Sequence, residues 1–191
     1  MKIGFTCQGS TDEAFLEGLK ESVCPRAVLI KGDARGSSGE SFRREIRKIL
    51  PALREKGAEI FIILNDSDAG KFREIKKRES AYVPEEYKAD TVYGIAERNI
   101  ECWLTADQNY CKKRFGTSPP RDSRFRKKYF VKAMGISARS PKKEDIISFV
   151  KDAQIGEWRK KSRSFDHFCR ELVVMEKKKN CGRLFINAAF E

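Results

Sequence analysis

The stretch EIFIILNDS, residues 59–67, decides how the fold of this chain is interpreted. Its five consecutive apolar residues, 60–64, predict a strand that is buried on both faces, as the strands of a parallel sheet are. The polar run of residues 65–68 follows this strand without a spacer and contains the acids Asp66 and Asp68. Because the ligands of open parallel sheets bind at the carboxyl ends of the strands, the position of the two acids is as informative as their chemistry.

Two carboxylates that lie two residues apart at a strand end project to the same side of the sheet. Their hard oxygen atoms suit a divalent cation, so Asp66 and Asp68 are candidate ligands of Mg²⁺ or Mn²⁺. The alternative is a structural role in which both acids cap a helix that begins near Ala69, since Asp is a favoured N-cap residue and DSDAG is a good turn sequence. One aspartate is enough for a cap, which favours metal binding by the pair.

The composition indicates one folded domain with a full core and at most a small appendage. The chain has 191 residues, of which 40% are hydrophobic and 13 are Phe. No apolar run is long enough to span a bilayer, and the first residues lack a signal-peptide pattern. The six cysteines form no CxxC pair and accompany a single histidine, which argues for reduced thiols and against a zinc site. We therefore expect a cytoplasmic protein that does not enter a membrane.

Positive charge is concentrated in the C-terminal part of the chain, whose formal net charge is +12 as a whole. Residues 1–110 carry 18 Lys and Arg against 19 Asp and Glu, whereas residues 111–191 carry 22 against 9. A basic region beside an acidic metal site suits a polyanion such as DNA or RNA. Excess lysine is also a common way to keep a small protein soluble, so charge alone leaves both interpretations open.

Short apolar patterns predict four strands, at residues 2–7, 27–30, 60–64 and 90–96. Helical patterns separate them, and Ser10 or Thr11 is expected to cap the first helix. This alternation predicts an α/β fold over residues 1–110, with a mostly parallel four-stranded sheet and helices on both faces.

Residues 111–191 are predicted to form a basic, mainly helical extension packed on that domain. Helices are expected at 129–134, from a start at 140–144 and from about Ser164, with a final short strand or strap at 184–190. The basic residues between positions 112 and 128 are Lys112, Lys113, Arg114, Arg121, Arg124, Arg126, Lys127 and Lys128. Interleaved with Phe115 and Phe125, they have the composition of a surface that binds single-stranded nucleic acid. They fit equally well a solvated connector whose Phe side chains pack on the sheet domain.

In such a sheet, the ends of the first, third and fourth strands meet at one edge. This arrangement brings Asp12, which follows the first strand, near Asp66 and Asp68. It also brings in Glu97 or Glu101, which follow the fourth strand. We predict that these acids converge on a common point. The alternative for Asp12 is a structural role in the first turn of its helix, where acids are favourable.

Three motifs occur in order along this part of the chain, CQGSTDEAFL at 7–16, ILNDSD at 63–68 and ECWLTAD at 101–107. Their order resembles a Toprim domain, in particular the small stand-alone Toprim-like proteins related to the nuclease module of OLD-family proteins. The resemblance implies that Asp66 and Asp68 hold Mg²⁺ or Mn²⁺. It also implies that Asp12 and Glu101 join them as catalytic and metal-binding acids.

The first motif departs from the family at Gln8, which precedes Gly9 and stands where Toprim enzymes have a glutamate. Glutamine offers a carbonyl oxygen but neither a charge nor a proton acceptor of useful basicity. The resemblance implies a metal-dependent nuclease that hydrolyses phosphodiester bonds of DNA or RNA, in a prokaryotic defence or nucleic-acid processing system. The alternative, favoured by Gln8, is a catalytically degenerate Toprim module that binds nucleic acid, a nucleotide or a protein partner.

Overall fold

The computed structural model describes residues 1–34, 39–68, 70–135 and 142–179. Its four strands are β1 (Lys2–Thr6), β2 (Val28–Lys31), β3 (Ile60–Asp66) and β4 (Thr91–Ala96). All pairings are parallel, and the strand order is β2-β1-β3-β4. The predicted four-stranded parallel sheet is therefore confirmed.

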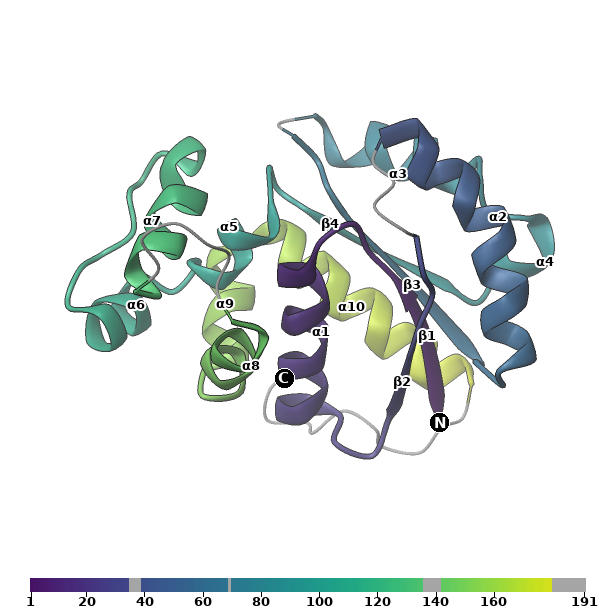
Figure 1. Ribbon diagram of the computed structural model, residues 1–191, viewed down its shortest axis with the longest axis horizontal. Helices are drawn as coiled ribbons and strands as arrows, with labels where there is room; N and C mark the ends of the chain where they lie inside the picture. The colour runs from purple at the N-terminus through teal and green to yellow at the C-terminus, as the bar shows by residue number, and fades with distance from the viewer. Residues whose placement is uncertain (35–38, 69, 136–141, 180–191) are drawn as a thin grey trace.

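Helices connect the strands and continue through the C-terminal part (Figure 1). They are α1 (Ser10–Val23), α2 (Gly39–Glu55), α3 (Phe72–Ser80), α4 (Glu85–Lys88), α5 (Ile100–Leu104), α6 (Gln108–Phe115), the 3₁₀ turn η1 (Ser123–Phe125), α7 (Arg126–Ala133), α8 (Lys143–Lys151), α9 (Ile155–Lys161) and α10 (Arg163–Lys178). The predicted α/β class and the helical C-terminal region are thus confirmed. The expected segment 184–190 and the first part of the helix start at 140–144 lie outside the described residues.

Strand β3 is buried on both faces, as its apolar run predicts. Ile60, Ile62 and Leu64 join the core cluster that contains α1 and α10. Phe61 and Ile63 join the cluster on the other face, which contains α2 and α3. The alternation of side chains along a strand therefore gives the sheet two separate apolar cores, one on each face.

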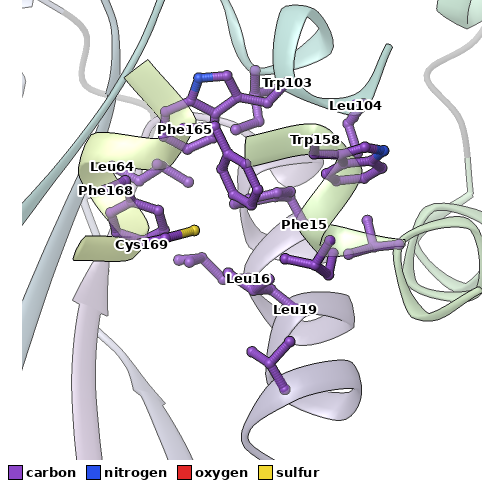
Figure 2. Packing of buried hydrophobic residues seen from close by; sticks show 14 of the residues in the cluster. Phe15, Leu16, Leu19, Leu64, Trp103, Leu104, Trp158, Phe165, Phe168 and Cys169 are labelled. Atoms are coloured by element: carbon purple, nitrogen blue, oxygen red, sulfur yellow. The ribbon is translucent and has the colours of Figure 1, made fainter. Parts of the chain in front are cut away.

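Helix α10 lies directly against β4. The C-terminal helices therefore belong to the same hydrophobic core as α1. Figure 2 shows Trp103 of α5, Phe15 of α1, and Phe165 and Phe168 of α10 packed together. The rings of Trp103 and Phe168 are stacked, with centroids 5.4 Å apart. Gly94 permits this approach, since a Cβ added there would lie 3.2 Å from the ring of Phe168. The aromatic cluster fixes α5 at the end of β4.

The predicted cap of the first helix is wrong, and so is the alternative in which Asp66 and Asp68 cap the helix after β3. Gly9, not Ser10 or Thr11, is the N-cap of α1. Its backbone N–H donates a hydrogen bond to Oδ2 of Asp12, at 2.9 Å. Helix α3 begins only at Phe72, with Lys71 as its N-cap, so the acids at the end of β3 do not cap the helix that follows them.

Within the described residues, the five cysteines are free, buried thiols. None of the helices in this part of the chain is long and apolar enough to cross a membrane.

Candidate functional site

Three acids from separate parts of the chain meet where β1, β3 and β4 end. Asp66 is the last residue of β3 and pairs in register with Ala96, the last residue of β4. Asp12 lies in the first turn of α1, which follows β1, and Glu101 lies in the first turn of α5, which follows β4. We call Asp12, Asp66 and Glu101 the acidic edge.

The two carboxylate oxygens of Asp66 differ in their hydrogen bonding. Its Oδ1 accepts a hydrogen bond from the backbone N–H of Ile100, at 3.0 Å, so Asp66 caps α5 from a neighbouring strand. No described group donates a hydrogen bond to its other carboxylate oxygen. Burial raises the pKa of Asp66 to about 7, and the negative charges of Asp12 and Glu101 act in the same direction. The unused oxygen is therefore held beside two other acids.

Asp12 is only 7% exposed and accepts the hydrogen bond from Gly9. Burial raises its pKa to about 6, and the charge of Glu101 contributes to the increase. Its neighbour Glu13 differs, because it pairs with Lys31 and with Lys143, the latter at 2.7 Å. Against the effect of burial, these two ammonium groups hold the pKa of Glu13 below its usual value. Asp12, and not Glu13, belongs to the acidic edge.

Glu101 is the member of the acidic edge without an evident structural partner. It is 4% exposed, and no side chain of the described residues forms a hydrogen bond or ion pair with its carboxylate. Burial raises its pKa. Glu97, the alternative to Glu101, is exposed at the end of β4, and its charge is not among the main causes of the raised pKa of Asp12 or Asp66.

Lys127 is a cation whose charge acts on all three acids. It lies in the first turn of α7, is exposed, and lowers the pKa of Asp12, Asp66 and Glu101. The sequence pattern placed Lys127 only among the basic residues for nucleic acid. Its link to the acidic edge depends on the packing of α7 against α5, for which the sequence carries no local signal.

Asp68 lies apart from the acidic edge. Strand β3 ends at Asp66, and Asp68 follows in a turn with a φ of 48°. The side chain is exposed, whereas Ser67 between the two acids is buried and its Oγ accepts a hydrogen bond from the N–H of Arg98, at 2.7 Å. The strand alternation from which we expected both acids on one side thus does not extend to Asp68, although its charge still raises the pKa of Asp66.

A chain of hydrogen bonds fixes Gln8 beside the acidic edge. Its Nε2 donates to Oδ1 of Asn65, at 2.8 Å, and the N–H of Asp66 donates to the same oxygen, at 2.9 Å. Nδ2 of Asn65 donates to Oε1 of Glu79, at 3.1 Å, and Glu79 is fully buried. In this orientation Asn65 presents its Oδ1, a hydrogen-bond acceptor, to residue 8. An amide side chain at position 8 can donate a hydrogen bond to this oxygen, whereas a carboxylate cannot. Sequence reasoning missed both Asn65 and Glu79.

The acidic edge has the donor chemistry for a hard divalent cation, since it consists of carboxylates with the amide oxygen of Gln8 nearby. However, the described part of the chain contains no group of three His, Cys, Asp or Glu side chains arranged closely enough to hold a metal ion. The side chains are therefore of the kind that binds such an ion. To bind it, the three carboxylates would have to move closer to one another. Asp107 of the third motif caps α6 and pairs with Lys161, at 2.8 Å, so it is structural.

The eight basic residues separate into two groups. Arg124 donates hydrogen bonds to Asp122, and Arg126 donates to the carbonyl oxygens of Pro120 and Cys102. The remaining six are exposed, and their side chains form no hydrogen bond or ion pair with another described residue; they are Lys112, Lys113, Arg114, Arg121, Lys127 and Lys128. These six side chains are available for phosphate groups.

No protein-family model, curated protein or solved structure matches this chain. The functional interpretation therefore rests on the chemistry of the acidic edge and of the basic helices beside it.

Proposed function

We propose that this protein is a Toprim-type, metal-dependent nuclease that hydrolyses phosphodiester bonds of DNA or RNA at the acidic edge. The observation that carries the proposal is the meeting of Asp12, Asp66 and Glu101 at the carboxyl end of a parallel sheet, with raised pKa values and with Lys127 facing them. Groups whose pKa values are strongly perturbed by burial and by each other are typical of functional sites.

Stability alone does not account for this arrangement. Neighbouring buried carboxylates raise the free energy of the folded state when they ionise. Asp12 and Asp66 also accept hydrogen bonds from helix N-termini, so each has a structural reason to be present. The carboxylate of Glu101 has no donor from another described residue and interacts only with its own backbone N–H. A cation shared by the three acids would offset the cost of its burial.

Each part of the proposed site has a separate role. Asp12, Asp66 and Glu101 would hold Mg²⁺ or Mn²⁺, with Asp68 at the exposed rim. A bound ion of this kind acts as a Lewis acid on phosphate and lowers the pKa of bound water. Lys127 neutralises charge on the phosphate that enters the edge. The other five exposed basic residues, Lys112, Lys113, Arg114, Arg121 and Lys128, contact flanking phosphates without reading the sequence.

The Toprim assignment of the fold is supported by the order of the three motifs and by their meeting at the edge of a parallel sheet. The alternative function is a catalytically degenerate Toprim module that binds nucleic acid, a nucleotide or a protein partner. Two observations favour this alternative. The amide of Gln8 is hydrogen-bonded to Asn65, and the carboxylates are too far apart to hold a metal ion as they stand.

Cleavage assays separate the two functions. The wild type, Asp66→Asn and Glu101→Gln would be incubated with labelled DNA and RNA in Mg²⁺ or Mn²⁺. Both substitutions remove a charge but keep the shape of the side chain, and we expect each to reduce cleavage on the order of 100-fold or more. Glu97→Gln is the matched control, since it neutralises a nearby exposed acid, and it should cleave like the wild type. Wild-type protein that leaves every substrate intact would contradict the nuclease proposal.

A further inference from the structure

Two aromatic residues accompany the basic residues of α6 and α7, and the structure separates their roles. Phe115 packs into the core, where its ring is stacked on that of Phe149 with centroids 5.3 Å apart. Phe125, the last residue of η1, is 54% exposed. Phe125 therefore presents its ring to solvent in the most basic part of the chain.

The segment that carries Phe125 is anchored at both ends. Asp122 caps η1 by accepting a hydrogen bond from the N–H of Arg124, at 2.9 Å. The guanidinium of Arg126 donates to the carbonyl oxygen of Cys102, at 3.3 Å, and thereby ties α7 to α5. Because α5 also carries Glu101, the segment with the ring is tied to an element that contributes to the acidic edge. A ring held in this way loses little conformational freedom when a ligand binds.

Phe125 is close in sequence to Lys127, the cation whose charge acts on the acidic edge. Phe125 and Lys127 are two residues apart, so their Cα atoms are separated by at most about 7 Å. The guanidinium carbon of Arg124 lies 5.7 Å from the centroid of the ring. Exposed Lys127 and Lys128 follow in the sequence, so the ring belongs to a strongly basic segment.

The surroundings of Phe125 fit a nucleobase better than a protein partner. The large hydrophobic residues that are exposed in the described part of the chain are Val28, Phe125 and Val174, which lie in β2, η1 and α10. They come from separate elements, whereas protein partners are usually bound by contiguous apolar patches. A single aromatic ring among basic groups is the arrangement with which proteins bind a base and its phosphates.

We infer that Phe125 is a stacking platform for an unpaired base, and that the protein therefore selects single-stranded DNA or RNA. The inference rests on the proposed function in one respect, because the strand that stacks on Phe125 passes Lys127 to reach the acidic edge. In a duplex, both faces of each base are covered by its neighbours in the stack, so the ring could not engage a base without unstacking it.

Binding measurements on the full chain test this inference. Fluorescence anisotropy in EDTA, which prevents cleavage, would compare a labelled 12-residue single-stranded DNA, the matching RNA and a blunt duplex of the same length. Phe125→Ala should weaken binding of either single strand about 10-fold, and Phe125→Trp should retain it, since stacking needs an aromatic ring. Binding of the duplex should not change. Val174→Ala, which removes another exposed apolar side chain, is the matched control and should have no effect.

A second readout distinguishes stacking from charge. Lys127→Ala should reduce the salt dependence of binding by about one counterion, whereas Phe125→Ala should leave that dependence as in the wild type. Equal losses on single strand and duplex, or wild-type affinity of Phe125→Ala for both single strands, would overturn the inference. If the wild type cleaves nothing but the effect of Phe125→Ala on single strands persists, the nuclease proposal fails and the stacking platform stands.

Discussion

Replacement of Asp66 by Asn removes one negative charge from the acidic edge and keeps the cap of α5. Burial, with the charges of Asp12 and Glu101, raises the pKa of Asp66 from 3.8 to about 7. The asparagine retains a carbonyl oxygen that can accept the hydrogen bond from the N–H of Ile100. We therefore expect Asp66→Asn to be more stable than the metal-free wild type at any pH where Asp66 is ionised.

The size of the effect follows from the pKa. A carboxyl whose pKa is higher in the folded than in the unfolded state destabilises the folded state as it ionises. The cost of Asp66 is therefore absent below about pH 4, grows up to about pH 7 and is constant above that. A pKa difference of about 3 corresponds to at most about 4 kcal/mol, which solvent screening at this partly exposed site reduces to about 2 kcal/mol.

Thermal melting in EDTA at pH 8 and at pH 4.5 measures this effect. For a chain of this size, about 2 kcal/mol raises Tm by roughly 4–8 °C. Asp66→Asn should show this increase at pH 8 and a clearly smaller one at pH 4.5, while the control Glu97→Gln should show neither. A lower Tm for Asp66→Asn at pH 8 would mean that Asp66 is only a helix cap. The reasoning would also be refuted by the same increase at both pH values.

Further predictions concern packing, the buried network and the pH dependence of activity. Gly94→Ala should destabilise the fold by about 1–3 kcal/mol in urea, because the added Cβ would lie 2.6 Å from Cδ1 of Leu64 and 3.2 Å from the ring of Phe168; full stability would show that these two side chains can move aside. Glu79→Ala should cost about 3 kcal/mol in the same assay, since it leaves its partner Arg43 buried without a carboxylate; a cost below about 1 kcal/mol would contradict that. Mg²⁺-dependent cleavage should rise with pH up to about pH 7 and then level off, because Asp66 must lose its proton before it can hold a cation; activity that falls over this range would exclude its role as a ligand.

The sheet and the three acids of its edge follow from local signals in the sequence. The apolar run of β3 predicts its burial, and the alternation of strands and helices predicts parallel pairing. Parallel strands share one carboxyl edge, so Asp12 and Asp66 could be brought together with Glu97 or Glu101 from the sequence, and the resemblance to Toprim domains favoured Glu101. Asp68 could not be placed in the same way, because the length of β3 decides where strand geometry ends.

Other features of the site arise from contacts between distant segments. The position of Lys127 opposite the acids depends on how α7 packs on α5, and composition describes it only as one of eight basic residues. The match between Gln8 and Asn65 depends on Glu79, which lies 14 residues after Asn65 and on the next helix. The different exposures of Phe115 and Phe125 likewise depend on the tertiary fold, since both occur in the same basic stretch.

The shared binding of a divalent ion by the acidic edge is tested most directly by calorimetric titration of Mn²⁺ into the metal-free protein at pH 8. Glu101 is the best position to vary, because no described side chain depends on it for a hydrogen bond. We predict that the wild type binds Mn²⁺ and that Glu101→Gln binds it at least about 10-fold more weakly. The far-ultraviolet circular dichroism spectrum of the variant should match that of the wild type. Equal binding by the two proteins, or no binding by the wild type at millimolar Mn²⁺, would contradict the proposal that these acids form a metal site.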